Sequence, residues 1–303
     1  MNIIELAGVT KTYGTVVAVD DLSMEVPKGS IYGFIGPNGS GKTTSIRMIM
    51  KIMYPDKGKL LINGREHDAQ RLKNVGYLPE DRGLYKKMKI GELLQFHGEL
   101  NNGQDLKNRI DYWLDRLDLS EYKDKKVETL SKGMRQKLQF IATILHQPEL
   151  IILDEPFSGL DPVNADILKD VILELQAKGA TIIFSTHDMS IAEKMCDYIF
   201  MIYQGKKVLD GTLTNIQDQY GNDTIQVQTE SGASALVGIA GIEKVNDFGK
   251  LQEVRVASGA DPQQILADLL KKTRITRFEI AKPSLNDIFI RIASPGRKEE
   301  NHG

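Results

Sequence analysis

A short glycine-rich segment near the N-terminus constrains this chain more than any other feature. It reads Gly36-Pro37-Asn38-Gly39-Ser40-Gly41-Lys42-Thr43 and fits the spacing G-x-x-x-x-G-K-[ST]. An apolar run, Ile31–Ile35, comes before it, and a stretch with helical spacing, 45–53, follows it. Glycines let successive backbone N–H groups turn inward around an anion, and the start of a helix adds partial positive charge. The segment predicts a phosphate-binding loop between a strand and a helix; a plain surface turn is the weaker alternative.

The last side chains of this loop suit a nucleotide with its metal ion. The ammonium group of Lys42 supplies a full charge to the β- and γ-phosphates. The hydroxyl group of Thr43 is a hard oxygen ligand of the kind that Mg²⁺ prefers. The loop therefore predicts ATP or a similar nucleotide as ligand, together with Mg²⁺.

Two carboxylates follow a second apolar run, 150–153, which predicts a buried strand. The ends of strands in α/β sheets open onto the ligand crevice. There Asp154 is placed to hold Mg²⁺, and Glu155 is placed to polarise an attacking water as general base. Acids that merely end a strand at the surface are the alternative. Two acids after four apolar residues, in a chain with a phosphate loop, favour the catalytic interpretation.

Four further positions are ambiguous when each is taken alone. Ser131, before the helical stretch 134–145, is a good helix N-cap residue. Asp161 lies in a segment that resembles an ordinary turn, and His187 follows the apolar run 181–184. Tyr13 is of a type usually found in the core, although its flat ring could stack on adenine. None of these positions predicts a function by itself.

The overall composition excludes several classes of protein. The 303 residues include 39 Lys and Arg against 41 Asp and Glu, a net charge of −2, which argues against a dedicated nucleic-acid binder. A single cysteine, Cys196, permits no intrachain disulfide and favours a reducing, cytosolic compartment. We expect no signal peptide, and no apolar run reaches the roughly 18 residues that a membrane-spanning helix needs. Any role at a membrane therefore requires a partner that spans it.

The hydrophobic pattern predicts two domains. Apolar runs alternate with helical patterns up to about residue 215, which indicates an α/β layer architecture. Helical patterns without a strand between them, over 90–100, 106–117 and 134–145, predict a helical insert at about 85–147. A polar stretch, 217–223, predicts a boundary that separates a domain over 1–220 from a smaller one over 221–294. We expect the polar tail, 295–303, to be disordered.

The smaller domain is expected to have an α+β, ferredoxin-like fold. Its predicted order is strand 224–229, helix 233–240, strand 242–246, strand 251–256, helix 262–271 and strand 275–280. This order matches a βαββαβ sandwich. A last helix is expected over 284–292.

Taken together, residues 1 to about 220 resemble the ATP-binding cassette (ABC) ATPases, in the order of the motifs as well as their content. The resemblance implies a P-loop NTPase fold with a helical subdomain. It implies that Tyr13 stacks on adenine and that Glu80 occupies the Q-loop position. It also makes His187 the switch histidine and a catalytic residue beside Glu155, Lys42 and Glu80. The remaining nucleotide-binding residues implied are Gly36, Pro37, Asn38, Gly39, Ser40, Gly41, Lys42, Thr43, Thr44, Ser131, Gly133 and Asp161, and the metal ligands are Thr43, Asp154 and Glu80.

Two positions depart from the family pattern. The Q-loop normally carries glutamine, whereas Glu80 is an anion that accepts but does not donate hydrogen bonds at neutral pH. The signature turn usually resembles L-S-G-G-Q, whereas this chain has Leu-Ser-Lys-Gly-Met over 130–134. The γ-phosphate contacts implied for Ser131 and Gly133 are kept, and the effects of Lys132 and Met134 stay open.

The segment 77–85, this signature variant and the small C-terminal domain resemble one bacterial subgroup, the ATPase subunits of ABC-2-type exporters similar to sodium-export and drug-export ATPases. The resemblance implies a homodimer, or a pair with another ABC ATPase, that sandwiches ATP and Mg²⁺ between two chains. Closure of the dimer drives a separate integral membrane permease. The chain is then cytoplasmic and peripheral on the inner face of the cell membrane, with no insertion into the membrane and no nucleic-acid partner.

Two alternatives stay open from the sequence. The first is a soluble ABC ATPase that acts on ribosomes or DNA; this chain has one cassette, no long coiled coil and no basic excess. The second is a regulatory nucleotide-binding module with little turnover, suggested by Glu80 and Lys132. The transported substrate is not predicted, because its specificity lies in the permease.

Overall fold

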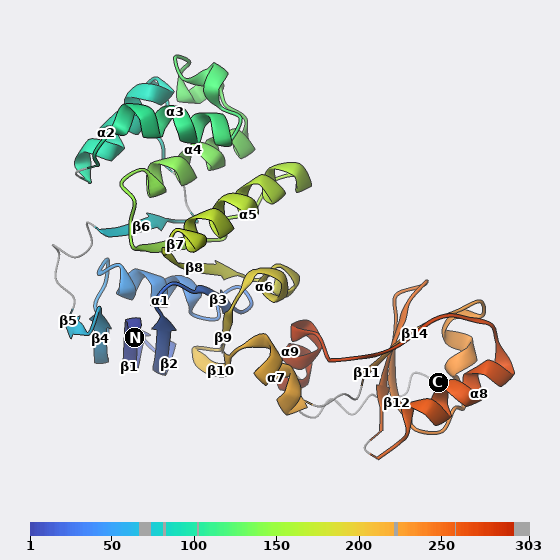
Figure 1. Cartoon of the computed structure of the whole chain (residues 1–303). Helices are drawn as coiled ribbons and strands as arrows, with labels where there is room; N and C mark the ends of the chain where they lie inside the picture. The colour runs from blue at the N-terminus through green and yellow to red at the C-terminus, as the bar shows by residue number, and fades with distance from the viewer. Residues whose placement is uncertain (67–73, 81–82, 102, 221–223, 258, 294–303) are drawn as a thin grey trace. The chain divides into compact units, whose positions relative to one another are not determined.

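The computed structural model describes the chain except for residues 67–73, 81–82, 102, 221–223, 258 and 294–303, so the predicted tail lies outside the described residues. Contacts divide the chain into two compact units, Met1–Thr212 and Leu213–Gly303. Figure 1 shows both units. The second unit begins with α7, Leu213–Tyr220. The predicted domain limits, 1–220 and 221–294, stay a prediction.

A mostly parallel six-stranded sheet forms the centre of the first unit, in the order β10-β9-β3-β8-β7-β6. Its strands are β3 Ile31–Ile35, β6 Val75–Leu78, β7 Leu150–Asp154, β8 Thr181–Thr186, β9 Tyr198–Tyr203 and β10 Lys206–Gly211. Only β10 pairs antiparallel, with β9. All residues of β3, β7 and β8 are buried. The continuous apolar runs of the sequence predicted this burial, because strands covered on both faces are apolar throughout.

Alternate residues of these strands enter two hydrophobic cores. Tyr32 and Ile152 pack between the central sheet and a four-stranded antiparallel sheet of order β2-β1-β4-β5. Helix α1, Lys42–Ile49, contributes Ile46 to the same core. The strands of the second sheet are β1 Asn2–Tyr13, β2 Val16–Pro27, β4 Lys57–Ile62 and β5 Arg65–Glu66. Ile151 and Phe184 point to the opposite face and join the other core.

The helical insert covers that opposite core. Its helices are α2 Ile90–Leu100, α3 Leu106–Arg116 and α4 Lys132–Ile144, joined by 3₁₀ turns at Ser120–Tyr122 and Val127–Thr129. Within the described residues of 85–147 the only β pairing is a single bridge between Lys89 and Lys126. Figure 1 shows the three helices together beyond the edge of the sheet that ends in β6. The remaining helices of the unit are α5 Pro162–Ala177 and α6 Met189–Met195.

The second unit contains an antiparallel sheet of order β12-β13-β11-β14. Its elements are β11 Thr224–Thr229, β12 Ile242–Asp247, β13 Gln252–Val256, α8 Pro262–Lys272, β14 Ile275–Ala281 and α9 Leu285–Ala293. Counted in chain order, the strands lie 2-3-1-4, which is the ferredoxin-like arrangement. Apolar side chains such as Ile225, Val254 and Leu269 form its core.

One predicted element of this unit is wrong. The helix expected over 233–240 is a short 3₁₀ turn, Gly232–Leu236. Val237 adopts an extended backbone directly after it, and Gly238 has a positive φ of 73°. Because an α-helix requires negative φ throughout, the chain leaves the helical path before a second turn can form.

Candidate nucleotide-binding and catalytic site

The phosphate loop connects β3 to α1 as predicted. It runs from the end of β3 at Ile35 to Lys42, the first residue of α1. Gly41, directly before the helix, has φ of 112°, and a Cβ atom there would lie 2.6 Å from the carbonyl oxygen of Ala18. Only glycine fits this turn, because a side chain would meet both a strained backbone and the neighbouring strand β2.

The side chain of Lys42 points back over the loop. Its Nζ donates to the carbonyl oxygens of Gly36 at 2.6 Å and Pro37 at 3.1 Å, and the residue is 6% exposed. Burial lowers the pKa of this ammonium group, although Glu155 and Asp154 oppose the shift. The charge is therefore held inside the loop, beside the backbone groups that would surround a phosphate.

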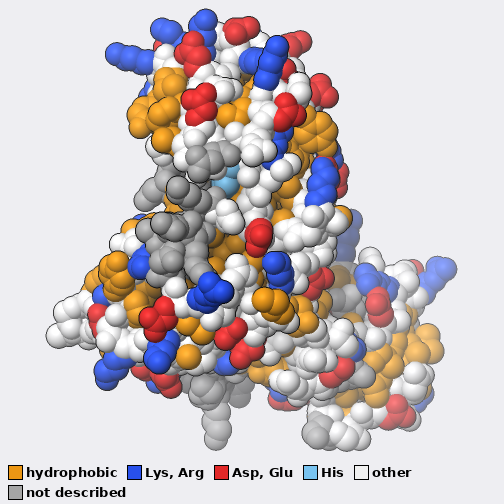
Figure 2. All heavy atoms as spheres, turned by 60° about the vertical axis from the view of Figure 1, so that its left-hand side comes forward, with side chains coloured by type: hydrophobic (Ala, Val, Ile, Leu, Met, Phe, Trp, Pro, Cys, Tyr) orange, Lys and Arg blue, Asp and Glu red, His pale blue; other side chains and the backbone are white. Residues whose placement is uncertain are grey.

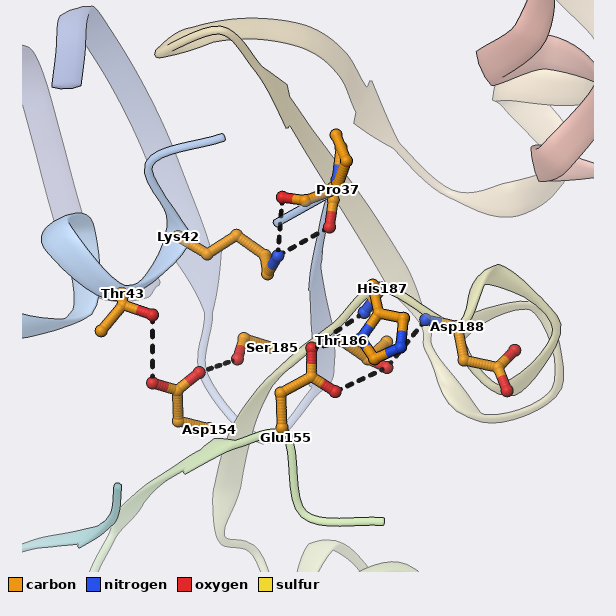
Figure 3. Close-up of polar contacts among 10 residues, drawn as sticks. Pro37, Lys42, Thr43, Asp154, Glu155, Ser185, Thr186, His187 and Asp188 are labelled. Atoms are coloured by element: carbon orange, nitrogen blue, oxygen red, sulfur yellow. Dashed lines mark hydrogen bonds and ion pairs between the residues drawn. The ribbon is translucent and has the colours of Figure 1, made fainter. Parts of the chain in front are cut away.

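Asp154 ends β7 and is almost completely buried. One carboxylate oxygen accepts a hydrogen bond from Ser185 Oγ, and the other lies 3.4 Å from Thr43 Oγ1 (Figure 3). A buried carboxylate beside a hydroxyl group is a pair of hard oxygen ligands. Among the described residues no three His, Cys, Asp or Glu side chains form a metal cluster. The pair fits Mg²⁺, which is commonly held by one or two carboxylates and the phosphates of a substrate.

Glu155 is oriented by the end of β8. Its Oε1 lies 2.8 Å from His187 Nδ1 and accepts from the backbone N–H of His187 at 3.1 Å. Its Oε2 accepts from Thr186 Oγ1 at 3.5 Å, as Figure 3 shows. Glu155 has a positive φ of 50°, a backbone conformation that persists only where the surroundings hold it. Parallel pairing of β7 with β8 thus brings the predicted base and the predicted histidine together.

These groups surround a cavity of about 240 Å³. Its lining is Ala18, Asn38, Gly39, Ser40, Gly41, Lys42, Thr43, Thr44, Glu80, Asp154 and Glu155. The cavity therefore unites most of the residues predicted for phosphate, metal and catalysis. Sequence reasoning missed Ala18, for which no local signal exists. It also missed Ser185 and Thr186, whose hydroxyl groups next to His187 were a usable signal.

Other predicted residues do not line this cavity. Tyr13 is 46% exposed, and its hydroxyl group donates to Met53 Sδ at 3.0 Å. Ser131 caps α4 by accepting from the backbone N–H of Met134, and neighbouring Gly133 lies in the first turn of the same helix. Asp161 caps α5, where hydrogen bonds from Asn164 lower the pKa of its carboxyl group. Within one chain these residues have structural explanations of their own.

The fold and the site together define a P-loop nucleotide-hydrolysing protein with a helical insert. Residues 19–158 match the model of the ABC transporter family, and residues 211–293 match the C-terminal domain of DrrA1-3-like ATP-binding proteins. The chain belongs to the ATP-binding proteins of ABC transporters and is an ATPase of that family.

Similar proteins span both units. The ABC transporter ATP-binding protein YhaQ of Bacillus subtilis (strain 168) is 39% identical, over 93% of this chain and 95% of that protein. Nod factor export ATP-binding protein I of Rhizobium sp. (strain N33) is 32% identical, over 98% of each chain. A solved structure of the ATP-binding subunit of an ABC transporter has a TM-score of 0.68 and 31% identity, covering 72% of this chain and 93% of that one. No helix in the described part of the chain is long and apolar enough to cross a membrane.

Proposed function

We propose that this chain is the ATP-hydrolysing subunit of a bacterial ABC exporter and drives a separate integral membrane permease. The observation that carries the catalytic part is the Glu155–His187 pair beside Lys42 and Asp154. The exporter part is supported by the full-length similarity to a Nod factor export protein and by the matching C-terminal domain. These similarities do not favour the alternatives of a ribosomal or DNA-associated ATPase or a low-turnover module.

The geometry supports a distinct role for each residue of the cavity. Lys42 and the loop amides bind and orient the phosphates, and Thr43 with Asp154 would hold Mg²⁺. Mg²⁺, when bound, neutralises charge on the phosphate oxygens. Glu155 accepts a proton from the attacking water, while His187 fixes the direction of its carboxylate. Glu80 lines the same cavity, as its predicted metal and catalytic role requires.

We assign Ser131, Gly133 and Asp161 to the nucleotide bound by a second chain. Ser131 and Asp161 are exposed and lie outside the cavity of their own chain. A two-fold pair of chains would complete each cavity with the signature turn of the other, in a homodimer or with a related ATPase. Tyr13, half-exposed on β1, is the proposed adenine-stacking residue.

The proposed docking surface for the permease lies next to Glu80. Exposed Tyr85 and Phe96 form an edge-to-face pair with ring centroids 6.1 Å apart, and Leu100 is also exposed. An adjacent cavity of about 310 Å³ lies between β6, α2 and α4 and includes Pro79. Figure 2 shows hydrophobic side chains gathered on the upper part of the molecule, where Figure 1 places α2 and α3. A permease bound here would place the chain on the cytoplasmic face of the membrane.

Exchange of Glu155 for glutamine tests the catalytic assignment. Glu155→Gln keeps the shape of the side chain and removes the base, so ATP binding should persist while turnover falls by a factor of about 10² or more. Fluorescent-ATP titration and a steady-state phosphate-release assay measure the two properties. Turnover equal to that of the unmodified chain would remove Glu155 from the role of base.

The exporter assignment needs a separate test. The chain is purified from membranes under mild detergent, and the integral proteins that remain bound are identified by mass spectrometry. We expect one multi-span membrane protein, lost in a Tyr85→Asp, Leu100→Asp variant that still hydrolyses ATP. Recovery of ribosomal proteins instead would favour the soluble alternative.

A further inference from the structure

The N-terminal half of α4 contacts the loop that follows Glu155. Gln136, 1% exposed, donates from its amide Nε2 to the carbonyl oxygen of Pro156, the residue directly after Glu155. The other amide atom, Oε1, is buried and has no hydrogen-bond partner in the described part of the chain. The hydrogen bond that Gln136 makes therefore joins α4 to the backbone next to Glu155.

A second contact joins the signature turn to the same loop. A Cβ atom on Gly159 would lie 2.9 Å from Lys132 Nζ and 3.0 Å from its Cε, so the end of the lysine side chain covers the glycine. Leu160 lies against Gly133, with a leucine methyl carbon 3.5 Å from the Cβ position. The lysine that departs from the family pattern therefore packs on the loop over 156–161.

The loop over 156–161 is anchored to β8 by contacts of its first residues and of Glu155. The backbone N–H of Glu155 donates to the carbonyl oxygen of Ser185 at 3.1 Å. Phe157 is buried against Phe184, with ring centroids 5.9 Å apart. The positive φ of Glu155, 50°, persists only where such contacts hold the backbone. The sheet holds Glu155 through Ser185, and Gln136 contacts the next residue, Pro156.

We propose that Gln136 and Lys132 form a brace that positions the Glu155 carboxylate through the loop over 156–161. Gln136 holds Pro156, and Lys132 limits the movement of Gly159. Both are positioning residues, because each contacts the loop that follows Glu155 and acts on the carboxylate through it. A misplacement of the base of about 1 Å can cost a factor of about 10² in rate.

The brace also links two nucleotide sites, and this step rests on the proposed function. In the two-chain arrangement, the signature turn of a chain faces the nucleotide of its partner. Glu155 acts on the nucleotide that its own chain binds. A brace from Lys132 and Gln136 to the Glu155 loop connects those sites inside one chain. Binding of ATP at one site would then bias the base at the other.

Gln136→Met tests the brace, since it keeps the length of the side chain and removes the donor. The matched control is Gln176→Met, because Gln176 on α5 also donates from Nε2 to a backbone carbonyl, that of Gly29 at 3.0 Å. We expect kcat of Gln136→Met to fall at least about tenfold, with ATP affinity and melting temperature close to those of Gln176→Met. Equal kcat values for the two variants would overturn the positioning role.

Lys132→Ala gives an independent measurement on an exposed residue, with Lys126→Ala as control. We expect a lower kcat and a lower Hill coefficient for ATP in Lys132→Ala, and neither change in Lys126→Ala. A Lys132→Ala chain with the kcat and Hill coefficient of the unmodified protein would overturn the proposed brace. An unmodified chain that hydrolyses ATP without any cooperativity would contradict the link between sites, and one without ATPase activity would contradict the proposed function itself.

Discussion

At the scale of single residues, burial decides the chemistry of the charged groups. Lys42 is nearly inaccessible, so burial lowers the pKa of its ammonium group while neighbouring carboxylates resist the change. Asp154 is even less exposed, and two hydroxyl groups face its oxygens. Each buried charge of the site thus has named partners, as the cost of burying an unpaired charge requires.

The same principle predicts an acid-sensitive residue outside the nucleotide site. Burial lowers the pKa of His146, and Arg109 adds to the shift, while the backbone of Val75 opposes it. The folded chain keeps the imidazole neutral, whereas the unfolded chain takes up a proton below its ordinary pKa of 6.5. The contribution of His146 to stability is therefore complete above that pH and is lost as the pH falls through the folded pKa.

A variant isolates this contribution. Between about pH 7.5 and about pH 5.5, the melting temperature of the unmodified chain should fall further than that of His146→Gln, because glutamine does not titrate. Thermal unfolding followed by circular dichroism at both values measures the difference. Parallel decreases in the two proteins would show that protonation of His146 does not destabilise the fold.

At the scale of elements, the turn from β3 into α1 is the point where backbone geometry controls binding. Gly41→Ala places a Cβ atom 2.6 Å from the carbonyl oxygen of Ala18 at a φ of 112°. The variant should lose at least about tenfold in ATP affinity, since the loop amides can no longer keep their positions. Titration with fluorescent ATP measures the loss.

Gly179→Ala is the matched control for this turn. Gly179 also has a positive φ, 96°, but no atom lies within 4 Å of its Cβ position. The Gly179→Ala variant has backbone strain like that of Gly41→Ala, but its new Cβ atom meets no neighbouring atom. The ATP affinity of Gly179→Ala should therefore be unchanged. If both variants bound ATP equally well, the phosphate loop would not depend on the close approach of β2.

Helices and strands could be predicted from the sequence where the spacing of apolar residues within one segment indicates them. The buried strands β7 and β8 and the helices of the insert agree with the expected ranges to within a few residues. The predicted helix over 233–240 failed because apolar spacing says nothing about φ, and Gly238 takes a left-handed backbone. Helix propensity and hydrophobic periodicity do not reveal a positive φ, which only the three-dimensional structure shows.

At the scale of the whole molecule, the proposed pairing of two chains makes a testable prediction. Lys42→Ala should weaken ATP binding, and Ser131→Ala should impair turnover only through the partner chain. In a mixture, a pair with one chain of each kind contains one site with both residues intact. Random pairing then restores at most about a quarter of the activity of the unmodified protein.

The measurement is steady-state ATPase activity as a function of the mixing ratio, with each variant alone as control. Activity should be greatest at equal amounts, where mixed pairs are most frequent. If no ratio exceeded the sum of the separate activities, the assignment of Ser131 to the partner's nucleotide would fail.

The sequence by itself determined the chemistry that depends on neighbouring residues. The phosphate loop over 36–43 and the carboxylates Asp154 and Glu155 were identifiable because their residue types and spacing form one continuous segment each. The α/β class followed from apolar runs of strand length. Only the tertiary structure decided which distant segments meet. The order β3-β8-β7 brings Ser185 to Asp154, and the packing of α4 brings Gln136 to Pro156. Such contacts depend on strand order and helix packing, which no local pattern of residues encodes.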